Sequence, residues 1–415
     1  MEEIFPKPYK RGKKRIGKRQ EEIQNVPVTV VTHRLSEEEL CAAFPDGRFK
    51  KLPDEVYKRL EFHPASFEVI EHHVEVYVSA DGGSFVRAER PADLFRNSLA
   101  TASLVAGIYN LKYVNAQPIE RLSKEFERSE VFLPTQTLCR WAVMGAERYL
   151  SRVYECMKQK LSDYHVMHAD ETVVEVRRDG RPAGTESRMW VYRSGELEPN
   201  PVILYEYQKT RKKEHAREFL KGFSGICVTD GYQVYHSIAD EREDLTIAGC
   251  WSHARRGFAD VVKAAGKKDV GIRQSVAYKS LQLIQTMSRY EEKLAKMEPA
   301  ERLEARIHYV LPLADAFFAY LKSKEGSVAP KSATGKAIRY CLNQERFLRV
   351  FLTDGYVPMT NNAAERSIRP FTVGRNNWFQ IDTVSGAKAS AIAYSIAETA
   401  KANHLKPYEY FRYLL

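Results

Sequence analysis

The chain has 415 residues, of which 44% are hydrophobic and 28% are charged, with 64 Lys and Arg against 54 Asp and Glu. This length allows two to four domains with their own cores, and the composition excludes a mainly disordered or fibrous protein. No run approaches the roughly 18–20 apolar residues of a membrane span, and the first residues do not resemble a signal peptide. Six cysteines without a CxxC pair suit a reducing compartment, so we expect a cytoplasmic protein with no membrane contact.

The positive charge is concentrated at the N-terminus. Residues 1–19 hold eight Lys or Arg and two Glu, a net +6 out of +10 for the whole chain. Such a segment has no apolar period with which to pack, so residues 1–25 are predicted to form a disordered basic arm. Basic side chains that contact phosphates release counterions, which favours DNA binding over the alternative of a solubilising tail. The expected DNA contacts in the arm are Lys10, Arg11, Lys13, Lys14 and Arg15.

Two modules are predicted before the middle of the chain. Residues 26–91 form a small β-rich module, in which 74–78 alternate and 81–83 mark a turn. A second alternation at Val26, Val28 and Val30 is limited to an edge strand by Pro27.

Residues 92–161 have a helical pattern. One helix is expected from Pro118 to Phe126, and another begins at Pro134 with Thr135 as its cap and with Leu138 and Trp141 on one side. A helix-turn-helix of this kind would place three polar side chains near DNA, although plain packing of a helical hairpin is the alternative. These three residues are Gln136, Thr137 and Arg140.

Strand patterns begin at residue 165. The expected strands are 165–176, 188–193, 202–207, 226–229 and 246–250, with a charged helix at 214–220. This order predicts an α/β fold. From Ala254 to about Arg349 the pattern is helical, with Leu281, Ile284, Met287 and Leu294 on one face and breaks at Pro299 and Pro312. Two further helices are expected around Glu365 and around 392–396.

Three carboxylates occupy predicted positions that are unusual for acidic side chains that only face solvent. Asp170 interrupts a predicted strand, a position that disfavours Asp. Asp230 directly follows a short buried strand, at the end where open α/β sheets bind ligands. Glu365 starts a short helix that Pro370 is expected to limit.

Each carboxylate has a structural alternative. Asp170 could pair with a buried base, and Asp230 could cap the following helix. Glu365 lies three residues after Asn362 and could be half of a capping box. Together the three residues instead indicate a site for Mg²⁺ or Mn²⁺, whose preferred ligands are hard oxygens, and two such ions can drive phosphoryl transfer on a nucleic acid.

Several motifs occur in order along the chain. They are Asp170-Glu171-Thr172, Val228-Thr229-Asp230-Gly231-Tyr232, the segment from Cys250 to Arg256, Asn361-Asn362-Ala363-Ala364-Glu365-Arg366-Ser367-Ile368-Arg369-Pro370, Gly374-Arg375-Asn376-Asn377-Trp378 and Glu398-Thr399-Ala400-Lys401. They resemble the motifs of the insertion-sequence 66 (TnpC-type) transposases, and the resemblance covers most of the chain.

The resemblance implies an RNase H-like DDE core, with Asp170, Asp230 and Glu365 as catalytic and metal-binding residues and two Mg²⁺ or Mn²⁺ ions. The core would occupy 162–255 and 356–415, with a helical insertion at 256–355. The spacings of 60 and 135 residues between successive carboxylates agree with an insertion in the second gap. The implied activity is cleavage at transposon ends, followed by transfer of the freed 3′-hydroxyl into target DNA, by a homo-oligomer assembled on DNA.

The sequence departs from the family in residues 26–91, which would correspond to a degenerate zinc ribbon. Relatives often carry paired CxxC ligands there, whereas this segment has only Cys41, and one thiol cannot hold a tetrahedral zinc. Cys250 and His253 form half of a metal site at most. We therefore expect no structural zinc.

Basic residues near the predicted site are candidates for DNA contacts. Those at 253–256 follow a predicted strand, and two more flank Glu365. They are His253, Arg255, Arg256, Arg366 and Arg369. A structural role for the histidine and a solvent-facing role for the arginines are the alternatives. Two other functions stay open: a catalytically inert DNA protein that binds the ends, and a structure-selective nuclease on the same fold.

Overall fold

The computed structural model describes residues 28, 30, 32, 36–43, 45, 66–79, 85–89, 92–182, 184–266 and 271–415. By its internal contacts the chain divides into residues 1–66 and 67–415. In the first unit, helix α2 (Glu37–Ala43) starts with a capping box, since the Glu39 amide donates to Ser36 Oγ and the Ser36 amide donates to Glu39 Oε2. Val28 and Val30 lie in no strand, and the predicted basic arm lies outside the described residues.

The second unit opens with a hairpin and a helical region. Strands β1 (Val76–Val78) and β2 (Phe85–Arg87) pair antiparallel, which confirms the strand predicted from the alternation at 74–78. The helical pattern after residue 92 is also confirmed. Its elements are α3 (Ala102–Tyr109), η1 (Asn110–Val114), α4 (Ile119–Arg128), α5 (Thr135–Gly145), η2 (Ala146–Leu150) and α6 (Ser151–Ser162).

The start of α5 corrects one expectation. Leu138 and Trp141 are buried as predicted, but Thr135 is the first helical residue and does not cap the helix with its side chain. The amides of Thr137 and Leu138 bond instead to the carbonyl of Pro134, whose extended backbone leads into the helix. Proline at this point has a fixed φ that suits a helix start, so no side-chain cap is needed.

A mixed sheet follows, with the order β5-β4-β3-β6-β7. The strands β3, β4 and β5 pair antiparallel, whereas β6 pairs parallel with both β3 and β7. All five strand predictions are confirmed within a few residues, and α7 and α8 lie between them in sequence. The bounds are β3 (Val166–Arg178), β4 (Glu186–Ser194), β5 (Ile203–Gln208), α7 (Lys213–Leu220), β6 (Gly225–Thr229), α8 (Gln233–Ala239) and β7 (Leu245–Gly249).

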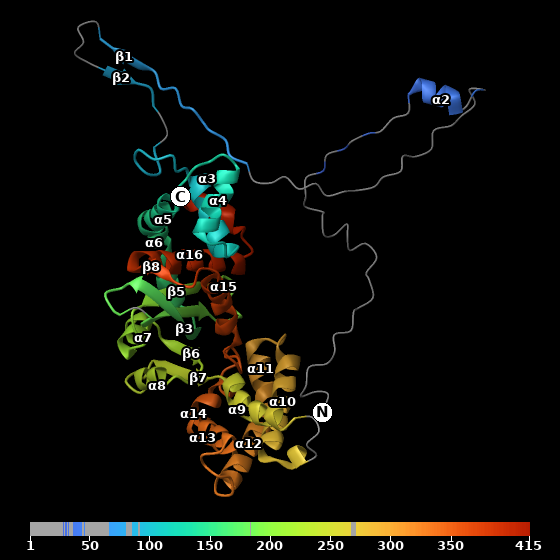
Figure 1. Cartoon of the computed structure of the whole chain (residues 1–415). Helices are drawn as coiled ribbons and strands as arrows, with labels where there is room; N and C mark the ends of the chain where they lie inside the picture. The colour runs from blue at the N-terminus through green and yellow to red at the C-terminus, as the bar shows by residue number, and fades with distance from the viewer. Residues whose placement is uncertain are drawn as a thin grey trace. The chain divides into compact units, whose positions relative to one another are not determined.

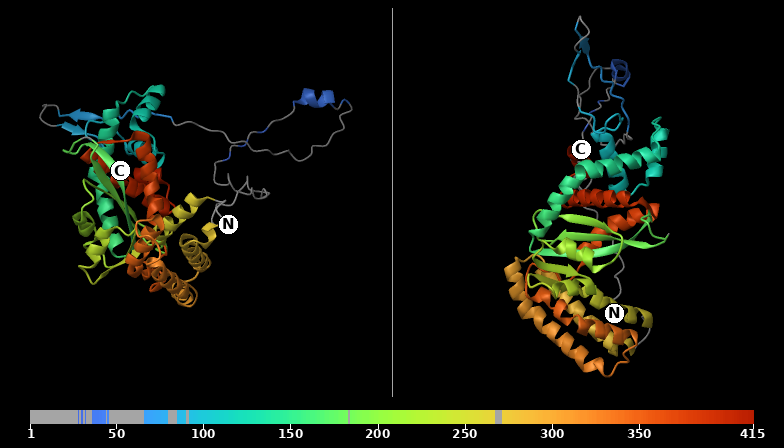
Figure 2. Two further views of the ribbon diagram at one scale, coloured as in Figure 1. Left: turned by 60° about the horizontal axis from the view of Figure 1, so that its bottom comes forward. Right: turned by 90° about the vertical axis from the view of Figure 1, so that its left-hand side faces the viewer.

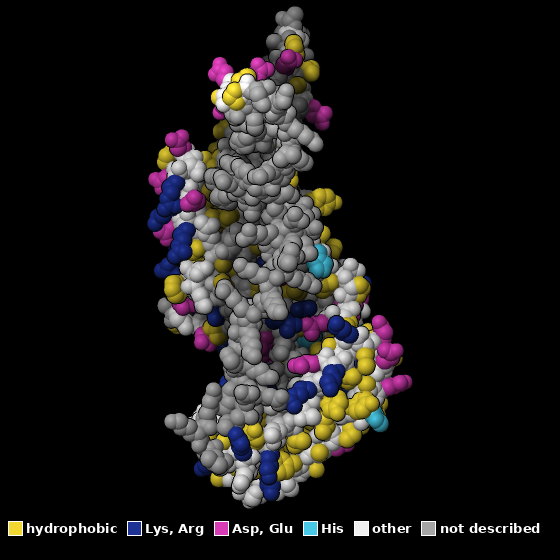
Figure 3. All heavy atoms as spheres, turned by 90° about the vertical axis from the view of Figure 1, so that its right-hand side faces the viewer, with side chains coloured by type: hydrophobic (Ala, Val, Ile, Leu, Met, Phe, Trp, Pro, Cys, Tyr) yellow, Lys and Arg dark blue, Asp and Glu magenta, His cyan; other side chains and the backbone are white. Residues whose placement is uncertain are grey.

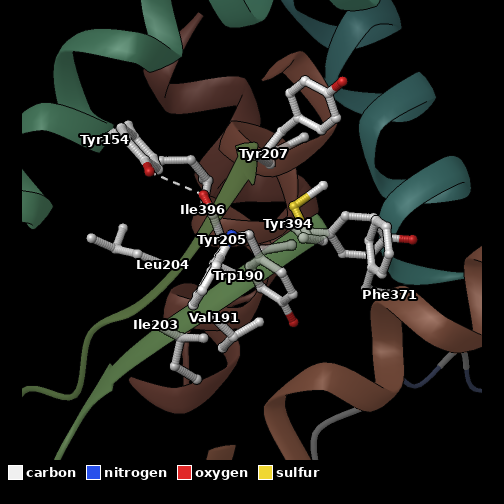
Figure 4. Close-up of a cluster of buried hydrophobic side chains, with 14 of the residues drawn as sticks. Tyr154, Trp190, Val191, Ile203, Leu204, Tyr205, Tyr207, Phe371, Tyr394 and Ile396 are labelled. Atoms are coloured by element: carbon white, nitrogen blue, oxygen red, sulfur yellow. Dashed lines mark hydrogen bonds between the residues drawn. The ribbon is translucent and has the colours of Figure 1, made fainter. Parts of the chain in front are cut away.

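Helix α16 (Val384–Ala402) covers the edge strand β5. The hydroxyl of Ser395 accepts from the Tyr205 amide at 2.8 Å, and that of Thr399 bonds both the amide and the carbonyl of Ile203. Tyr205 also packs against Tyr394 of α16, within the buried cluster that Figure 4 shows. Helix α16 therefore satisfies backbone groups at Ile203 and Tyr205 on the outer edge of β5.

Helix α15 (Asn362–Trp378) contacts β3 where the edge of the strand that does not pair with β4 lacks a partner strand. β3 pairs with β6 only at 166–168 and with the short strand β8 (Ile381–Thr383) only near 176–178. Between these points Asn361 Nδ2 donates to the Ala169 carbonyl at 2.9 Å, and Arg375 donates to the Val173 carbonyl. The helix is about 25 Å long and the strand from 169 to 176 about 23 Å, so the two elements match in length.

Pro370 does not end α15, contrary to the expectation from the sequence. A proline inside a helix removes one backbone hydrogen bond and crowds the preceding turn. The helix nevertheless continues, because its apolar face, which includes Ile368 and Phe371, is buried in the core. At Gly374 a side chain would collide with the rings of Tyr394 and Trp378, which shows how closely this face is packed.

Between β7 and α15 the chain forms a helical segment, residues 251–352, which lies at the β7 end of the sheet in Figures 1 and 2. The four residues predicted to share one face of its long helix α10 are buried. The predicted break at Pro299 is confirmed, because α10 ends at Leu294 and α11 begins at Pro299. The predicted break at Pro312 is wrong, because Pro312 lies in the first turn of α12, where proline is tolerated. The elements are α9 (Trp251–Ala265), η3 (Gly271–Gln274), α10 (Val276–Leu294), α11 (Pro299–Ala305), η4 (Arg306–Val310), α12 (Leu311–Glu325), α13 (Ala333–Asn343), α14 (Glu345–Leu348) and η5 (Val350–Leu352).

The chain ends with α17 (Pro407–Leu414), which packs on α3. No described helix is long and apolar enough to cross a membrane. All six cysteines are free, in agreement with the expected lack of a disulfide framework.

A buried arginine joins the helical segment to the loop that leads into α15. Arg306 is 1% exposed and binds both carboxylate oxygens of Glu291, at 2.9 and 2.6 Å. Its Nη1 donates to the carbonyls of residues 351, 354 and 357. In the same loop, Gly355 lies so close to the Pro299 carbonyl that a side chain would not fit. These contacts fix the backbone a few residues before α15 begins.

We expect Arg306→Met to lower the free energy of unfolding by about 3–5 kcal/mol, because it leaves the half-buried Glu291 carboxylate and three backbone carbonyls without their partner. Urea unfolding would measure the loss. Arg339→Met, on the exposed face of α13, is the matched control and should change stability by less than about 0.5 kcal/mol. Equal stability of the two variants would contradict the role given to Arg306.

Candidate active site

Asp170 and Asp230 lie on neighbouring strands. In the parallel pairing of β3 with β6, His168 is opposite Val228. Asp170 comes two residues later on β3, and Asp230 comes two residues after Val228, directly beyond the end of β6. Neighbouring strands are about 4.8 Å apart, so the two carboxylates emerge side by side at the C-terminal edge of β6. This placement agrees with the prediction for Asp230.

Glu365 reaches the same region from the first turn of α15. Its amide bonds to the carbonyl of Asn361, the residue that precedes the helix. Asn361 is fully buried, and its amide nitrogen donates to the Ala169 carbonyl, next to Asp170. The Asn361 backbone amide also contacts Cys250 Sγ at 3.1 Å, at the end of β7. One buried asparagine therefore ties the helix of Glu365 to the strand of Asp170.

The bond between Asn361 and His168 also fixes a tautomer. Because the Asn361 nitrogen faces the Ala169 carbonyl, its oxygen faces His168 Nδ1 at 2.8 Å, so Nδ1 carries the hydrogen and donates. Burial lowers the pKa of His168 to about 4, so the imidazole is neutral at physiological pH. Its Nε2 is buried and has no hydrogen-bond partner among the described residues.

A second polar tie holds the start of α15. Arg193 of β4 lies opposite His168, and its Nη1 is 3.3 Å from both the Ala363 carbonyl and Ser367 Oγ. Arg193 and Asn361 together position the first two turns of the helix against the sheet, and Glu365 lies on those turns.

The carboxylates repel one another. The pKa of Asp170 is raised to about 7, first by burial and then by the negative charges of Asp230, Glu171 and Glu365, against one opposing hydrogen bond from the Glu171 amide. No described basic side chain forms an ion pair with Asp170, so the alternative of a buried base as its partner is not supported. Raised pKa values of this kind are common where carboxylates are gathered for function.

The alternative roles of Asp230 and Glu365 as helix caps are also not fully supported. Helix α8 begins at Gln233 and has no side-chain cap, although Asp230 Oδ1 does accept from the Tyr232 amide at 3.0 Å in the turn before it. The residue that precedes α15 is Asn361, and no side chain caps this helix, so Asn362 and Glu365 do not form a capping box. Neither carboxylate is explained by capping alone.

The three carboxylates fit a divalent cation by their chemistry, because they offer hard oxygen ligands whose mutual repulsion a cation would relieve. The described part of the chain nevertheless contains no group of three His, Cys, Asp or Glu side chains that could already hold a metal ion. Asp170, Asp230 and Glu365 therefore lie in one region but do not form a complete coordination shell.

Basic residues surround this region. Arg256 Nη2 is 3.9 Å from Glu365 Oε1, and the half-buried His253 has its pKa lowered by burial, against the opposing effect of Asp230. Arg366 and Arg369 are exposed, and Arg366 pairs with Glu196. On the face shown in Figure 3, basic and acidic side chains lie next to one another near the middle of the molecule.

The other predicted DNA contacts are not joined to the site by any contact described here. Gln136 and Arg140 are exposed on α5, and Thr137 is half-buried. Arg255 is half-buried on α9. The arm residues Lys10, Arg11, Lys13, Lys14 and Arg15 lie outside the described part of the chain.

Three features of the site were missed in the sequence. Asn361 carries no sequence signal for a role in the site, although two adjacent asparagines directly before a predicted helix indicate its start. Arg193 gave no signal beyond a charge at the end of an apolar strand. The third is Arg211, which is described below with its partners Glu171 and Tyr232.

A family model described as "Transposase IS66 family" matches residues 97–389. The chain therefore belongs to the transposase IS66 family, as the sequence motifs predicted. Three uncharacterized proteins of Sinorhizobium fredii (strain NBRC 101917 / NGR234) are similar to it over most of its length. The protein y4qI is 28% identical over 85% of this chain and 66% of its own length. The protein y4hP is 28% identical over 88% of this chain and 68% of its own length. The protein y4jD is 26% identical over 78% of this chain and 63% of its own length.

The chain thus spans about two thirds of the length of these relatives. One solved structure, titled "Crystal structure of the Mos1 Strand Transfer Complex", is similar over 38% of this chain and 60% of that chain, with 12% identity and a TM-score of 0.14. A TM-score this low carries no argument about the fold.

We expect Asp170→Asn to stabilise the protein above neutral pH. The folded chain keeps a proton on Asp170 up to about pH 7, whereas the unfolded chain releases it near its ordinary pKa of 3.8. Between these values the folded state binds more protons, so wild-type stability falls as pH rises. The variant avoids this loss and should be more stable at pH 8 by roughly 2–4 kcal/mol, since one pKa unit corresponds to about 1.4 kcal/mol.

Urea unfolding in EDTA from pH 4 to pH 8 would measure the difference between variant and wild type, which should close toward pH 4. Asp260→Asn, at an exposed position on α9, is the control and should show no such dependence. A constant difference across this range would contradict the raised pKa.

Proposed function

We propose that this protein is a DNA transposase that cleaves DNA at transposon ends and transfers the freed 3′-hydroxyl into target DNA. Membership in the transposase IS66 family supports this activity in general terms. The observation that carries the mechanism is the gathering of Asp170, Asp230 and Glu365 in one region, where burial first, and then the charges of Asp230, Glu171 and Glu365, raise the pKa of Asp170. We take the sheet β5-β4-β3-β6-β7 as the RNase H-like core and the helical segment as an insertion into it.

In this proposal Asp170, Asp230 and Glu365 hold Mg²⁺ or Mn²⁺ ions. Bound there, two divalent ions would activate a water or a 3′-hydroxyl and stabilise the leaving oxygen. Asn361 and Arg193 hold the helix of Glu365 in place through the bonds described above. Arg256 is close to Glu365, and a bound phosphate could replace this carboxylate as its partner. The arginine would then neutralise charge on the phosphate.

DNA would be bound by basic residues on several elements. The exposed Arg366 and Arg369 flank Glu365, and His253 and Arg255 lie on the first turns of α9. We propose these side chains, with α5 and the N-terminal arm, as phosphate contacts that set the register of the DNA. Two transposon ends must be joined in one reaction, so we propose that the chain acts as a multimer on DNA.

We expect Asp230→Asn to abolish cleavage of a labelled duplex that carries the element's terminal inverted repeat, in the presence of Mg²⁺, and to preserve binding of that duplex. The substitution removes one anionic ligand but keeps the shape of the side chain. Cleavage would be followed on denaturing gels and binding by fluorescence anisotropy. Asp240→Asn is the matched control, because Asp240 pairs with Arg346 on the surface, and it should keep both activities.

Each other outcome has a distinct meaning. Cleavage by the Asp230→Asn variant would contradict the role of this carboxylate. A wild-type chain that binds the ends but never cleaves them would be an inert end-binding protein. Cleavage of branched DNA without joining and without preference for the ends would indicate a structure-selective nuclease.

A further inference from the structure

An arginine near Asp230 is held in a defined position although it faces solvent. Arg211 lies in the loop between β5 and α7, and its side chain is 41% exposed. Its Nε donates to Glu171 Oε1 at 2.6 Å, and Nη2 contacts the same oxygen. The guanidinium carbon lies 3.7 Å from the centroid of the Tyr232 ring, whose hydroxyl donates to the Arg211 carbonyl at 2.9 Å.

These contacts connect Arg211 to the carboxylate site. Tyr232 is two residues after Asp230, and its amide donates to Asp230 Oδ1. Gly231 between them has a φ of +94°, a left-handed conformation that favours glycine. Glu171 directly follows Asp170 on β3, with its side chain on the other face of the strand. Arg211 is therefore fixed by the immediate neighbours of two of the three carboxylates.

The contacts between Arg211 and Glu171 differ from those of an ion pair that only neutralises Glu171. An arginine that neutralises a buried carboxylate commonly binds both oxygens in a fork. Here both contacts go to Oε1, while Oε2 is buried and has no partner among the described residues, and the Glu171 side chain is only 4% exposed. No described residue accepts a hydrogen bond from Nη1 of Arg211, so this nitrogen can donate to an anion from outside.

Two of the three neighbouring lysines are engaged elsewhere, whereas the third, Lys212, is exposed. Lys209 Nζ donates to the Asp179 carbonyl at 2.6 Å, and Lys213 Nζ binds the Ser237 carbonyl and Glu241. In this loop, Arg211 is therefore the basic residue whose side chain is oriented by contacts with Glu171 and Tyr232.

We infer that Arg211 binds a phosphodiester of the DNA strand beside the carboxylate site, with Glu171 and Tyr232 fixing its guanidinium for that contact. The inference rests on the proposed function, since it assigns a further DNA contact to the same site. A guanidinium suits this role because its planar donors match phosphate oxygens and its charge does not titrate. The ion pair and the ring contact reduce the conformational entropy lost when the phosphate binds.

The test is the salt dependence of DNA binding, measured in EDTA so that cleavage plays no part. The probe is a fluorescein-labelled duplex of the terminal inverted repeat, followed by anisotropy at several NaCl concentrations. Each phosphate contact contributes about 0.9 to the slope of log K against log salt. Arg211→Met should reduce the magnitude of the slope by about 0.9 and weaken binding at low salt.

A double variant separates this contact from a structural role. Glu171→Gln with Arg211→Met removes both charges, so no buried charge is left unpaired. If Arg211 binds phosphate, the double variant keeps the reduced slope. If Arg211 only neutralises Glu171, the affinity and slope return to the wild-type values, and the inference is overturned. Thermal unfolding of both variants would show whether the fold is retained.

Lys221→Met controls for net charge. Lys221 is exposed at the far end of α7, about 12 Å along the helix, and its loss also removes one positive charge. The slope should stay at the wild-type value, and a reduction equal to that of Arg211→Met would overturn the inference. A wild-type chain that binds no DNA would contradict the proposed function as well, whereas normal binding with an unchanged slope in Arg211→Met contradicts this inference alone.

Discussion

The carboxylate site depends on one buried amide. Asn361 bonds to the carbonyl of Ala169 and to the ring of His168, and both residues belong to the strand that carries Asp170. A primary amide can donate and accept at once, so it joins the strand and the helix of Glu365 without adding charge to a region that already holds several carboxylates. An acidic residue here would increase their repulsion, and an apolar residue would leave the Ala169 carbonyl unpaired.

The helical segment also helps to fix the start of α15, through contacts with the loop that leads into this helix. Arg306 binds the carbonyls of residues 354 and 357 in the loop that precedes Asn361, and that of Phe351 at the end of the helical segment. The missing side chain of Gly355 lets this loop approach Pro299. The backbone therefore enters α15 from a fixed point. The long separation of Glu365 from the other carboxylates in sequence does not imply a loose connection in space, because the intervening helices hold the incoming chain.

The sequence predicted the elements of the sheet well, because each strand has a core of β-branched, aromatic or other apolar residues and is bounded by turns or charged helices. It failed where packing between distant parts of the chain decides the outcome. Pro370 is a local signal for a helix end, yet the burial of Phe371 and its neighbours keeps α15 intact. The positions of the three carboxylates in the predicted elements identified them as candidates, and the family motifs agreed, but the roles of Asn361 and Arg193 depend on partners far away in the sequence, which no local pattern contains.

The hydroxyls of Ser395 and Thr399 have a consequence for assembly. They bond to the backbone of β5, the last strand on its side of the sheet. A free edge of this kind is where a strand from another molecule can add and extend the sheet. Helix α16 takes up hydrogen bonds at Ile203 and Tyr205 that such a strand would need, so a strand from another copy of the chain cannot extend the sheet at these residues of β5.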